Sequence, residues 1–446
     1  MFQKRNTIGH MKQKEKRIVS MRSIAIREIR ARQILDCKGK PMLEVDVLTE
    51  GGALGRASSP SGVSAGEHEA YVLRDQNPDF FGGLSVYKCI EAVENVIAPS
   101  LKGMSVLDQE KIDNTLITLD GTPNKSHLGG NTLYSVSLAC LKAACRVLNL
   151  PMYEYLTPKP ITTIPLPTYN IISGGSYQKG SMPFQEITVV PYKAEDLMEA
   201  VHIGWQMFEM APKVIEDVTK SPAKPGKLSG WQSPTTDPIV CFELMLEIAN
   251  RCGVADKIAF ATDCASSEFY NKERNTYDFV DRELDTDEMI GYLKEMTTRF
   301  PFLYCEDVLQ ENDWEGWVKA NRELNRTILI GDDFTVTNVA FLKKAYELKA
   351  CGGFIFKPNQ VGTVTECIAA HEYAQSVGMI TVPSIRAGAV ANDSIFDMAV
   401  AFGAPCTKQG PPRNGERIYG INFLARVASL HPNAKPYDFT TIARCF

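Results

Sequence analysis

KIAFATD, at residues 257–263, is the first of six short apolar runs from which the architecture of this chain can be inferred. The others follow at helix-length intervals: PFLYCED (301–307), TILIGDD (327–333), GGFIFK (352–357), MITVPS (379–384) and APCTK (404–408). Short apolar runs that alternate with amphipathic segments are typical of parallel strands joined by crossover helices. So many units favour a closed α/β barrel over an open doubly wound sheet, and no Gly-x-Gly-x-x-Gly turn follows the first strand.

Upstream of these runs the sequence has a different rhythm. SIAIREIRA (23–31) and MLEVDVLTE (42–50) alternate apolar and polar residues, and Gly39 and Pro41 between them mark a turn, which together predict a β-hairpin. A Gly/Ser-rich loop at 60–70 comes next, followed by helical patterns near residues 87–98, 107–119 and 133–148. Strands followed by helices indicate an α+β unit.

The proline-punctuated stretch LTPKPITTIPLP, at 156–167, predicts a linker between these two parts. We therefore expect an N-terminal α+β domain over residues 23–160 and a barrel over residues 161–446. Residues 1–22 are basic, with seven lysines and arginines against Glu15, and we expect them to form a solvated tail.

Composition excludes several classes of protein. The chain has 446 residues, of which 44% are hydrophobic, and a net charge of -5, which argues against nucleic acid as the main partner. No apolar run reaches the ~18 residues that span a bilayer, so we expect no membrane-integral segment. The twelve cysteines contain no Cys-x-x-Cys pair and follow no secretory signal, so we expect reduced thiols and a cytoplasmic protein.

Carboxylates end three consecutive apolar runs, at Asp263, at Glu306 with Asp307, and at Asp332 with Asp333. The carboxyl ends of barrel strands converge on one face, so these side chains should approach a common point. A ligand set made only of oxygen selects a hard cation such as Mg²⁺. Aspartate is also a favoured helix N-cap, and that interpretation stays open for any one of these acids.

Two lysines follow later runs in the same way, Lys357 after GGFIF and Lys408 after APCT. A lysine beside a second ammonium group has its charged form disfavoured, which makes it a candidate general base. The six histidines do not cluster in the sequence, so we do not expect histidine to bind the metal.

Many longer stretches resemble enolase, the glycolytic lyase that dehydrates 2-phosphoglycerate to phosphoenolpyruvate. The resemblance covers nearly the whole chain after the tail and rests on RQILDCKGKPMLEVDV, PSGVSAGEHEA, LDGTPNKSHLGGN, SLACLKAA, FQEITVVP, DCASSEFY, EDVLQENDWEGW, GDDFTVTN, KPNQVGT and GERIYGINFLARV. It implies an enolase-type, TIM-like (β/α)8 barrel with an N-terminal α+β capping domain. It also implies a Mg²⁺ cofactor and a homodimer.

The resemblance assigns roles to individual positions. It implies that the structural Mg²⁺ is held by Asp263, Glu306 and Asp332, that Lys357 is the base at C2, and that Lys408 neutralises the substrate carboxylate. The remaining implied contacts are Glu186 in catalysis, Gln185 and Arg386 with the substrate, and Ser64 with a second Mg²⁺.

Departures from the family pattern lie in the loops that face the substrate. Ser229, in LSGWQSP, stands where the family has the glutamate of a Gly-Asp-Glu-Gly-Gly loop, and Tyr177, in SYQKG, replaces a histidine. In SIRA, Ile385 and Ala387 replace a histidine and a serine on either side of Arg386, while Ala65 and Pro358 are smaller changes.

These departures leave three hypotheses. The chain is an enolase whose turnover is impaired, or an enzyme that removes a proton from another carboxylate. Alternatively, it is a catalytically inactive enolase paralogue with a structural or protein-interaction role.

Overall fold

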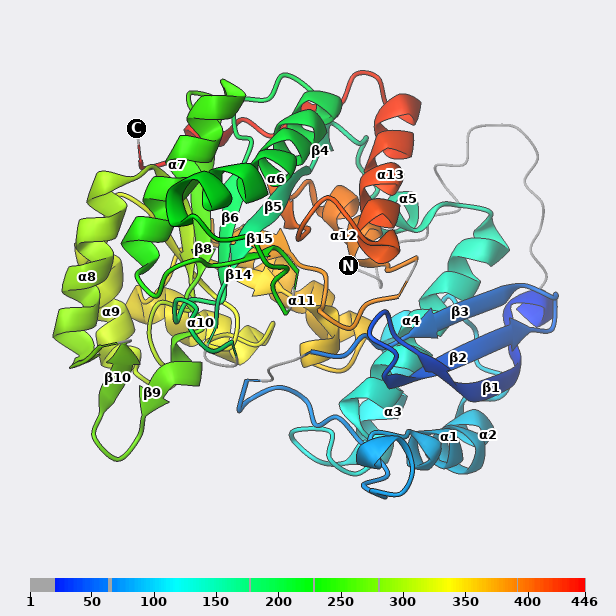
Figure 1. Cartoon of the computed structure of the whole chain (residues 1–446). Helices are drawn as coiled ribbons and strands as arrows, with labels where there is room; N and C mark the ends of the chain where they lie inside the picture. Colours follow the sequence, from blue (N-terminus) through cyan, green and yellow to red (C-terminus); the bar gives the residue numbers. More distant parts are fainter. Residues whose placement is uncertain are drawn as a thin grey trace.

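The computed structural model describes residues 21–62, 66–175, 178–227, 229–279, 281–390 and 392–445 (Figure 1). Ser64 and Tyr177, for which the sequence suggested roles, lie outside the described residues, as does the basic tail up to residue 20. The N-terminal domain, blue to cyan in Figure 1, lies beside a larger barrel, coloured green to red.

A three-stranded antiparallel sheet opens the N-terminal domain. Its order is β1 (Ile26–Leu35), β2 (Pro41–Thr49) and β3 (Leu54–Ser58), so the predicted hairpin is confirmed. Gly39 has φ +72° in the turn between the first two strands, a conformation that glycine adopts without strain.

Helices make up the rest of the N-terminal domain, and several of them pack against this sheet. They are α1 (Tyr87–Ala92), a π-helical turn (Val93–Ile97), α2 (Ala98–Leu101), α3 (Gln109–Asp120), α4 (Gly130–Leu148) and α5 (Met152–Leu156). A Cβ atom at Gly55 in β3 would lie 2.0 Å from the backbone oxygen of Ala139 in α4, so only glycine allows this strand and helix to pack so closely.

The barrel sheet has the strand order β15-β14-β13-β12-β8-β6-β5-β16. Its strands are β5 (Leu166–Ser173), β6 (Glu186–Val190), β8 (Ala259–Asp263), β12 (Phe302–Glu306), β13 (Ile328–Gly331), β14 (Gly353–Phe356), β15 (Ile380–Pro383) and β16 (Cys406–Lys408). A parallel bridge between Ser384 and Lys408 joins the two ends of this order and closes the barrel. The six apolar runs are therefore confirmed as strands β8 and β12 to β16.

The barrel differs from an all-parallel sheet at β6, which is antiparallel to both β5 and β8. Hydrophobic periodicity indicates that a segment is a strand but not in which direction it runs, so this feature was not predicted. The register pairs Glu186 at the start of β6 with Asp263 at the end of β8. The reversed strand therefore brings a glutamate to the end of the barrel where the other acids lie.

Helices surround the barrel in the pattern that crossover connections require. They are α6 (Leu197–Thr219), α7 (Pro238–Cys252), α8 (Thr286–Arg299), α9 (Trp314–Glu323), α10 (Val339–Leu348), α11 (Val364–Ser376), α12 (Ile395–Phe402) and α13 (Gly415–Leu430). Asp285 caps α8 in a capping box with Glu288, which shows how the chain marks a helix start.

Short strands complete the structure. A small sheet, β9 (Tyr270–Asn271), β10 (Thr276–Phe279) and β11 (Arg282–Leu284), extends from the barrel, β7 (Trp231–Gln232) pairs with β5, and β4 (Thr163–Ile164) pairs with β17 (Lys435–Pro436).

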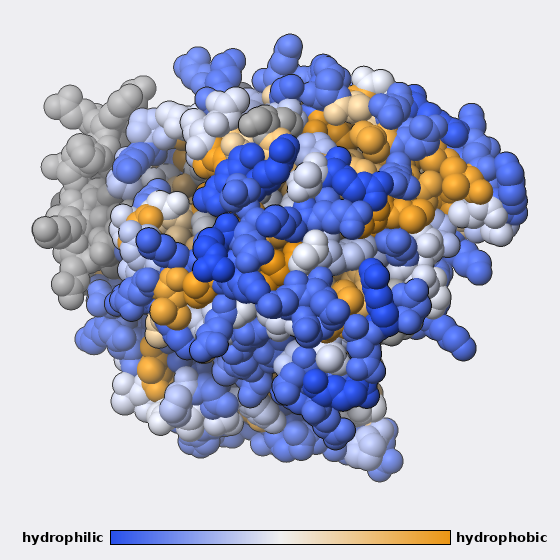
Figure 2. All heavy atoms as spheres, turned by 90° about the vertical axis from the view of Figure 1, so that its left-hand side faces the viewer, coloured by the Kyte–Doolittle hydropathy of each residue, from blue (hydrophilic) through white to orange (hydrophobic). Residues whose placement is uncertain are grey.

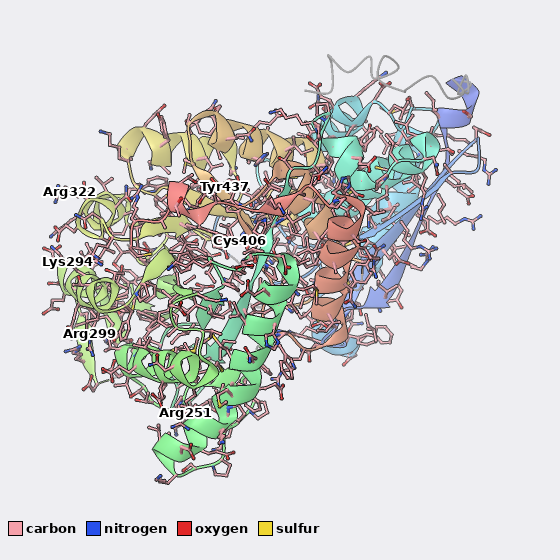
Figure 3. The ribbon with its side chains drawn as sticks, turned by 90° about the horizontal axis from the view of Figure 1, so that it is seen from above. Arg251, Lys294, Arg299, Arg322, Cys406 and Tyr437 are labelled. Carbon is pink, nitrogen blue, oxygen red and sulfur yellow. The ribbon has the colours of Figure 1, made fainter. Side chains whose placement is uncertain are left out.

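Charged residues lie on the outer faces of the barrel helices. Figure 3 shows Arg251, Lys294, Arg299 and Arg322 at the outer edge of the barrel and Cys406 inside it, and each of the four basic residues forms an ion pair with a nearby acid. Figure 2 shows a mostly hydrophilic face with hydrophobic residues in several groups. Among the described residues, no helix combines the length and the apolar character needed to cross a membrane.

Candidate active site

The strand ends bring five of the predicted residues to one end of the barrel. Asp263, Glu306 and Lys408 are the last residues of β8, β12 and β16, and Asp332 and Lys357 directly follow β13 and β14. The three acids are buried, with 4%, 0% and 6% of the surface of Asp263, Glu306 and Asp332 exposed. Buried carboxylates require a compensating positive charge, so their partners define what this centre can do.

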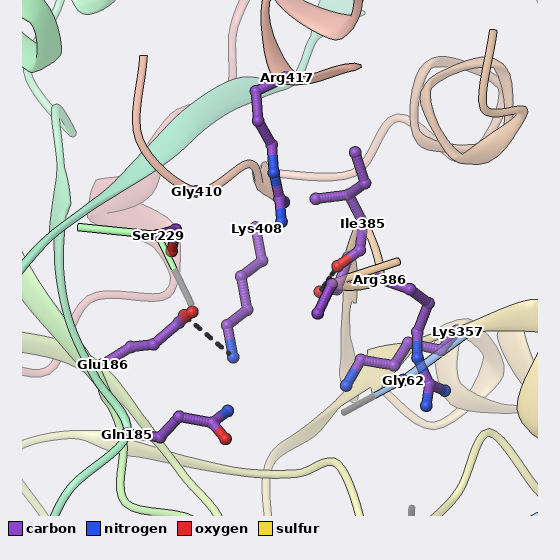
Figure 4. Close-up of a pocket in the computed structure, with 12 residues that line it drawn as sticks. Gly62, Gln185, Glu186, Ser229, Lys357, Ile385, Arg386, Lys408, Gly410 and Arg417 are labelled. Atoms are coloured by element: carbon purple, nitrogen blue, oxygen red, sulfur yellow. Dashed lines mark hydrogen bonds and ion pairs between the residues drawn. The ribbon is translucent and has the colours of Figure 1, made fainter. Parts of the chain in front are cut away.

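Lys408 supplies that charge for two of the acids. Its Nζ lies 2.7 Å from Asp263 Oδ2, 2.8 Å from each carboxylate oxygen of Glu306 and 3.6 Å from Glu186 Oε2 (Figure 4). Burial lowers the pKa of Lys408. The neighbouring acids, Asp263 and Glu306 first among them, raise it by more than burial lowers it, so the net pKa is well above its ordinary value. Burial and repulsion from Asp263 raise the pKa of Glu306.

Lys357 pairs with the third acid. Its Nζ donates to Asp332 Oδ2, and Gln360 Nε2 donates to the other oxygen at 2.8 Å. Burial acts to raise the pKa of Asp332, but the nearby cations, Lys357 first and then Lys408, together lower it more, and the net direction is down. Burial lowers the pKa of Lys357, but the surrounding carboxylates, Asp332 first among them, together raise it more, so the net pKa is above its ordinary value. The neighbouring ammonium of Lys408 does disfavour the charged form of Lys357, as expected, but Asp332 has the larger effect.

The contacts of Asp307 could not be predicted from the sequence. Its two oxygens accept the backbone N–H groups of Asp332 and Asp333 at 2.9 Å each. Among the described residues, Asp307, Asp332 and Asp333 form the one group of three acids whose oxygens lie within 4.8 Å of one another. Asp332 thus belongs to this group, whereas Asp263 and Glu306 meet at the ammonium of Lys408.

The helix-cap interpretation of the strand-end acids does not describe what the structure shows. Asp263 Oδ1 accepts the backbone N–H of Ala265 in a local turn, and Gln185 Nε2 donates to Asp263 Oδ2 at 3.0 Å. The N-caps of the following helices α8, α9 and α10 are Asp285, Asp313 and Asn338.

Arg386 is buried against an acid from the N-terminal domain. Its guanidinium forms two hydrogen bonds with the Glu69 carboxylate, at 3.2 and 3.3 Å, and the side chains of both residues are 5% exposed. Glu69 also accepts a hydrogen bond from Gln360 Nε2 at 3.3 Å. Glu69 could not be predicted as a site residue from the sequence, because its partner Arg386 lies 317 residues away.

One cavity connects most of the predicted positions. It has an empty volume of about 580 Å³, partly open to solvent, and its lining includes Gln185, Glu186, Ser229, Lys357, Ile385, Arg386, Ala387 and Lys408 (Figure 4). In Figure 4 the side chains of Lys357 and Lys408 extend toward the side where Gln185 and Glu186 lie. The acids Asp263, Glu306 and Asp332 form ion pairs with these lysines.

The loop that carries Ser229 is held firmly in place. Ser229 is 6% exposed, and its Oγ accepts a hydrogen bond from Asn170 Nδ2 at 3.0 Å. Arg413 donates to the backbone oxygen of Ser229 at 3.0 Å and lies 4.9 and 5.4 Å from the rings of Phe208 and Trp231. Arg413, in the loop between β16 and α13, was not predicted from the sequence.

The opposite part of the cavity wall is apolar or neutral apart from two arginines. Ile385 is 7% exposed and its backbone N–H donates to the oxygen of Lys408, while the backbone oxygen of Ala387 accepts a hydrogen bond from Cys37 Sγ. Arg417 also lines the cavity, and its Nη1 donates to the backbone oxygen of Gln409 at 3.0 Å.

The donor set fits a hard divalent cation. The candidate ligand atoms are all carboxylate oxygens, which Mg²⁺ prefers. Around the two lysines, four buried acids and the half-buried Asp333 lie close together; the buried ones are Asp263, Glu306, Asp307 and Asp332. Acids therefore outnumber the ammonium groups, and a further positive charge would lower their mutual repulsion.

Comparison with protein families agrees with this architecture. Residues 26–156 match the family model of the enolase N-terminal domain, and residues 161–442 match that of the enolase C-terminal TIM barrel domain. With matches in both domains and over nearly its whole length, this chain belongs to the enolase family.

Proposed function

We propose that this protein binds Mg²⁺ and a small phosphorylated carboxylate in the cavity, and that it acts on 2-phosphoglycerate as an impaired phosphopyruvate hydratase. The observation that carries the proposal is the position of Lys357 and Lys408, which line one cavity and contact buried strand-end acids. The family provides the substrate class. As part of the same proposal, the reaction serves glycolysis in the cytoplasm.

Asp263, Glu306 and Asp332 are the residues that we propose as Mg²⁺ ligands. A bound Mg²⁺ contributes stabilisation of negative charge on the substrate, typically worth several kcal/mol. The lysine ammonium groups and a cation compete for the same oxygens, so each lysine becomes available to an anionic substrate once its carboxylate is taken. Ser64, proposed as a ligand of a second Mg²⁺, lies outside the described residues.

Lys357 is the proposed base. The C2–H bond breaks, the proton moves to the neutral amine of Lys357, and the electron pair moves into the substrate carboxylate, whose charge Lys408 helps to neutralise. Because the Asp332 carboxylate raises the pKa of Lys357, the ion pair between them has to open before the amine can accept a proton.

Completion of the reaction requires a proton donor for the C3 hydroxyl, which leaves as water. Glu186 is the acid that lines the cavity, 3.6 Å from Lys408 Nζ, and we propose it as the remaining donor. Ser229 has only a hydroxyl group to offer, and its Oγ accepts a hydrogen bond from Asn170 Nδ2. The loss of a general acid typically lowers a rate by about 10²–10⁴.

We also expect weak binding of the substrate phosphate. Arg386 is the proposed phosphate contact, but Glu69 already neutralises its guanidinium. Ile385 and Ala387 on either side add no charge. We therefore expect proton removal to be better preserved than elimination.

The test separates these two halves of the reaction. The full-length protein is incubated with Mg²⁺ and 2-phosphoglycerate in D₂O, deuterium at C2 is followed by NMR, and phosphoenolpyruvate is followed by absorbance. We expect exchange at C2 to exceed elimination by at least tenfold. A Lys357→Ala variant should lose both signals, and Ser229→Ala should retain exchange.

Three results decide the proposal. Exchange that persists in Lys357→Ala contradicts the assignment of the base. Elimination as fast as exchange contradicts the impairment. Exchange that occurs on other carboxylates but not on 2-phosphoglycerate contradicts the proposed substrate and favours an enzyme that removes protons from a different acid.

A second function, that of an inactive paralogue with a structural or interaction role, is favoured by one observation. Lys357, Lys408 and Arg386 each have a buried acidic partner in the chain itself, so these charges are neutralised without any ligand. Calorimetric titration with Mg²⁺ followed by 2-phosphoglycerate distinguishes the two. Saturable heat with wild type that is lost in Asp332→Ala supports the enzyme, and no heat in either supports the paralogue.

We also propose that the protein is a homodimer, as the family resemblance implies. Light scattering of the purified full-length chain tests this directly. A mass of twice the chain mass is expected, and a monomer at micromolar concentration contradicts it.

A further inference from the structure

The lining of the cavity at the strand ends carries an excess of positive charge. Within the described part of the chain it holds one acid, Glu186, and four cations: Lys357, Lys408, Arg386 and Arg417. The first three cations each form an ion pair with a buried acid. Arg417 differs from them, and no step of the proposed reaction uses it.

Arg417 lies in the first turn of α13, and its closest partner is neutral. Its Nη1 donates to the backbone oxygen of Gln409 at 3.0 Å. Its ion pair with Glu416 is long, because Nε lies 3.7 Å from Oε1, which is beyond hydrogen-bond distance. Among the described residues, none accepts a hydrogen bond from Nη2, so this nitrogen still has donors to offer.

The guanidinium of Arg417 is accessible from the cavity. The side chain keeps 10% of its surface exposed and lines the cavity, and in Figure 4 it extends toward Lys408. Nη2 is not enclosed among the buried polar atoms that lack a partner. Gly410 leaves room beside it, since a Cβ atom there would lie only 3.1 Å from Arg417 Nη1. An anion in the cavity can therefore contact this group directly.

The two arginines of the lining differ in how far nearby carboxylates compensate their burial. Burial lowers the pKa of both. Around Arg386 the carboxylates, Glu69 first among them, raise the pKa by more, so its net pKa is above the ordinary value. Around Arg417 the carboxylates of Glu186 and Glu416 raise it by less, so its net pKa is below the ordinary value. A buried cation with incomplete compensation gains most from an arriving anion.

We propose that Arg417 binds the phosphate group of the ligand, while the reacting carboxylate lies at Lys408. This inference rests on the proposed function, which supplies a phosphorylated carboxylate. Hydrogen bonds from a guanidinium to phosphate oxygens are charge-assisted and roughly twice as strong as neutral ones. Glu186, the acid of the lining, lies 3.6 Å from Lys408 Nζ, so its charge is partly compensated and repels the phosphate less.

Inorganic phosphate is the first probe, because it binds without a metal and without turnover. It is titrated into the full-length protein in the presence of a chelator and followed by calorimetry and phosphorus NMR at millimolar concentrations. Arg417→Gln should weaken binding by about tenfold or more. Arg426→Gln, at an exposed position on the same helix, should leave it unchanged. Equal binding by wild type and Arg417→Gln, or no binding by wild type, overturns the proposal.

Arg417→Lys separates the loss of charge from damage to the fold. Lysine keeps the positive charge but cannot reproduce the hydrogen bond to Gln409 with the same geometry. We expect Arg417→Lys to bind phosphate more tightly than Arg417→Gln does, although both variants should melt at similar temperatures. Equal loss of phosphate binding in the two variants would show that the charge is not what binds, and would overturn the proposal.

A pair of ligands distinguishes failure of this inference from failure of the proposed function. With Mg²⁺ present, wild type should prefer 2-phosphoglycerate to glycerate, which lacks the phosphate, and Arg417→Gln should lose most of that preference. An unchanged preference in Arg417→Gln overturns the role of Arg417, whatever the rate of exchange at C2. If wild type shows no exchange at C2 but its phosphate binding depends on Arg417, the proposed function fails and the phosphate site stands.

Discussion

The floor and the rim of the strand-end cavity are built on different principles. On the floor, buried acids contact the ammonium groups of Lys357 and Lys408, so the centre is dense in paired charges. On the rim, Ser229, Ile385 and Ala387 carry no charge, and hydrogen bonds and aromatic packing hold the Ser229 loop. Charge stabilisation and proton removal depend on the floor, whereas expulsion of a leaving group depends on a donor at the rim.

Removal of the central ammonium from the floor should have the largest effect. In Lys408→Met, Asp263 and Glu306 lose their common partner while they remain buried. An uncompensated buried charge typically costs about 3–5 kcal/mol, so the free energy of unfolding should fall by roughly that amount in guanidinium titrations. Mg²⁺ should restore part of the loss if these acids bind it.

Lys344→Met is the matched control for that variant. Lys344 lies exposed on α10 over the ring of Trp314, and its loss should cost about 1 kcal/mol. If Lys408→Met is as stable as Lys344→Met, the floor does not depend on charge pairing.

A buried acid outside the cavity sharpens the contrast, because it has neutral donors instead of an ammonium group. Asp113 lies between α3 and α11, accepts hydrogen bonds from Thr365 and Gln109, and burial raises its pKa to about 6. A raised pKa means that the folded state binds the proton more tightly than the unfolded state does. Its contribution to stability is therefore full below about pH 4 and is lost as the pH rises through 6.

Asp113→Asn should remove this pH dependence. Relative to the variant, the wild type should lose on the order of 2–3 kcal/mol of unfolding free energy between pH 4 and pH 7. Asp278→Asn, at an exposed position on β10, serves as the control and should follow the wild-type profile. Parallel profiles for wild type and Asp113→Asn would show that folding does not raise the pKa of Asp113.

Release of the rim loop should have a smaller effect. Arg413→Ala removes a hydrogen bond to the backbone oxygen of Ser229 and the contacts with the rings of Phe208 and Trp231. We expect a loss of about 2 kcal/mol of stability and faster proteolysis near residues 223–230. Arg426→Ala, an exposed arginine beside Tyr419, should change neither, and equal effects would mean that Arg413 does not hold the loop.

The smallest effect should follow Ser229→Ala. The variant loses one neutral hydrogen bond from Asn170, which corresponds to about 1 kcal/mol in unfolding free energy. Elimination should change by less than threefold if Ser229 donates no proton. A decrease of a hundredfold in phosphoenolpyruvate formation would show that the rim takes part in the chemistry after all.

Much of the architecture could be predicted because it depends on local patterns. The strands that precede Asp263, Glu306 and Asp332 are continuous apolar runs, and the parallel arrangement places their ends together. The reversed direction of β6 could not be predicted, since a strand has the same periodicity in either direction. The role proposed for Ser64 and the effect of Tyr177 in place of a histidine remain predictions, because both residues lie outside the described part of the chain.

The amino-acid sequence by itself determined the order of the elements, the family and the residue types at the strand ends. Only the tertiary structure decided which residues become partners across long separations in the chain. Glu69 pairs with Arg386, and Arg413 donates to the backbone oxygen of Ser229. It also decided the direction in which the pKa of Lys357 shifts. That direction is a balance of burial, the carboxylates of Asp332 and Glu306, and the cations of Arg386 and Lys408, and each depends on distances that exist only after folding.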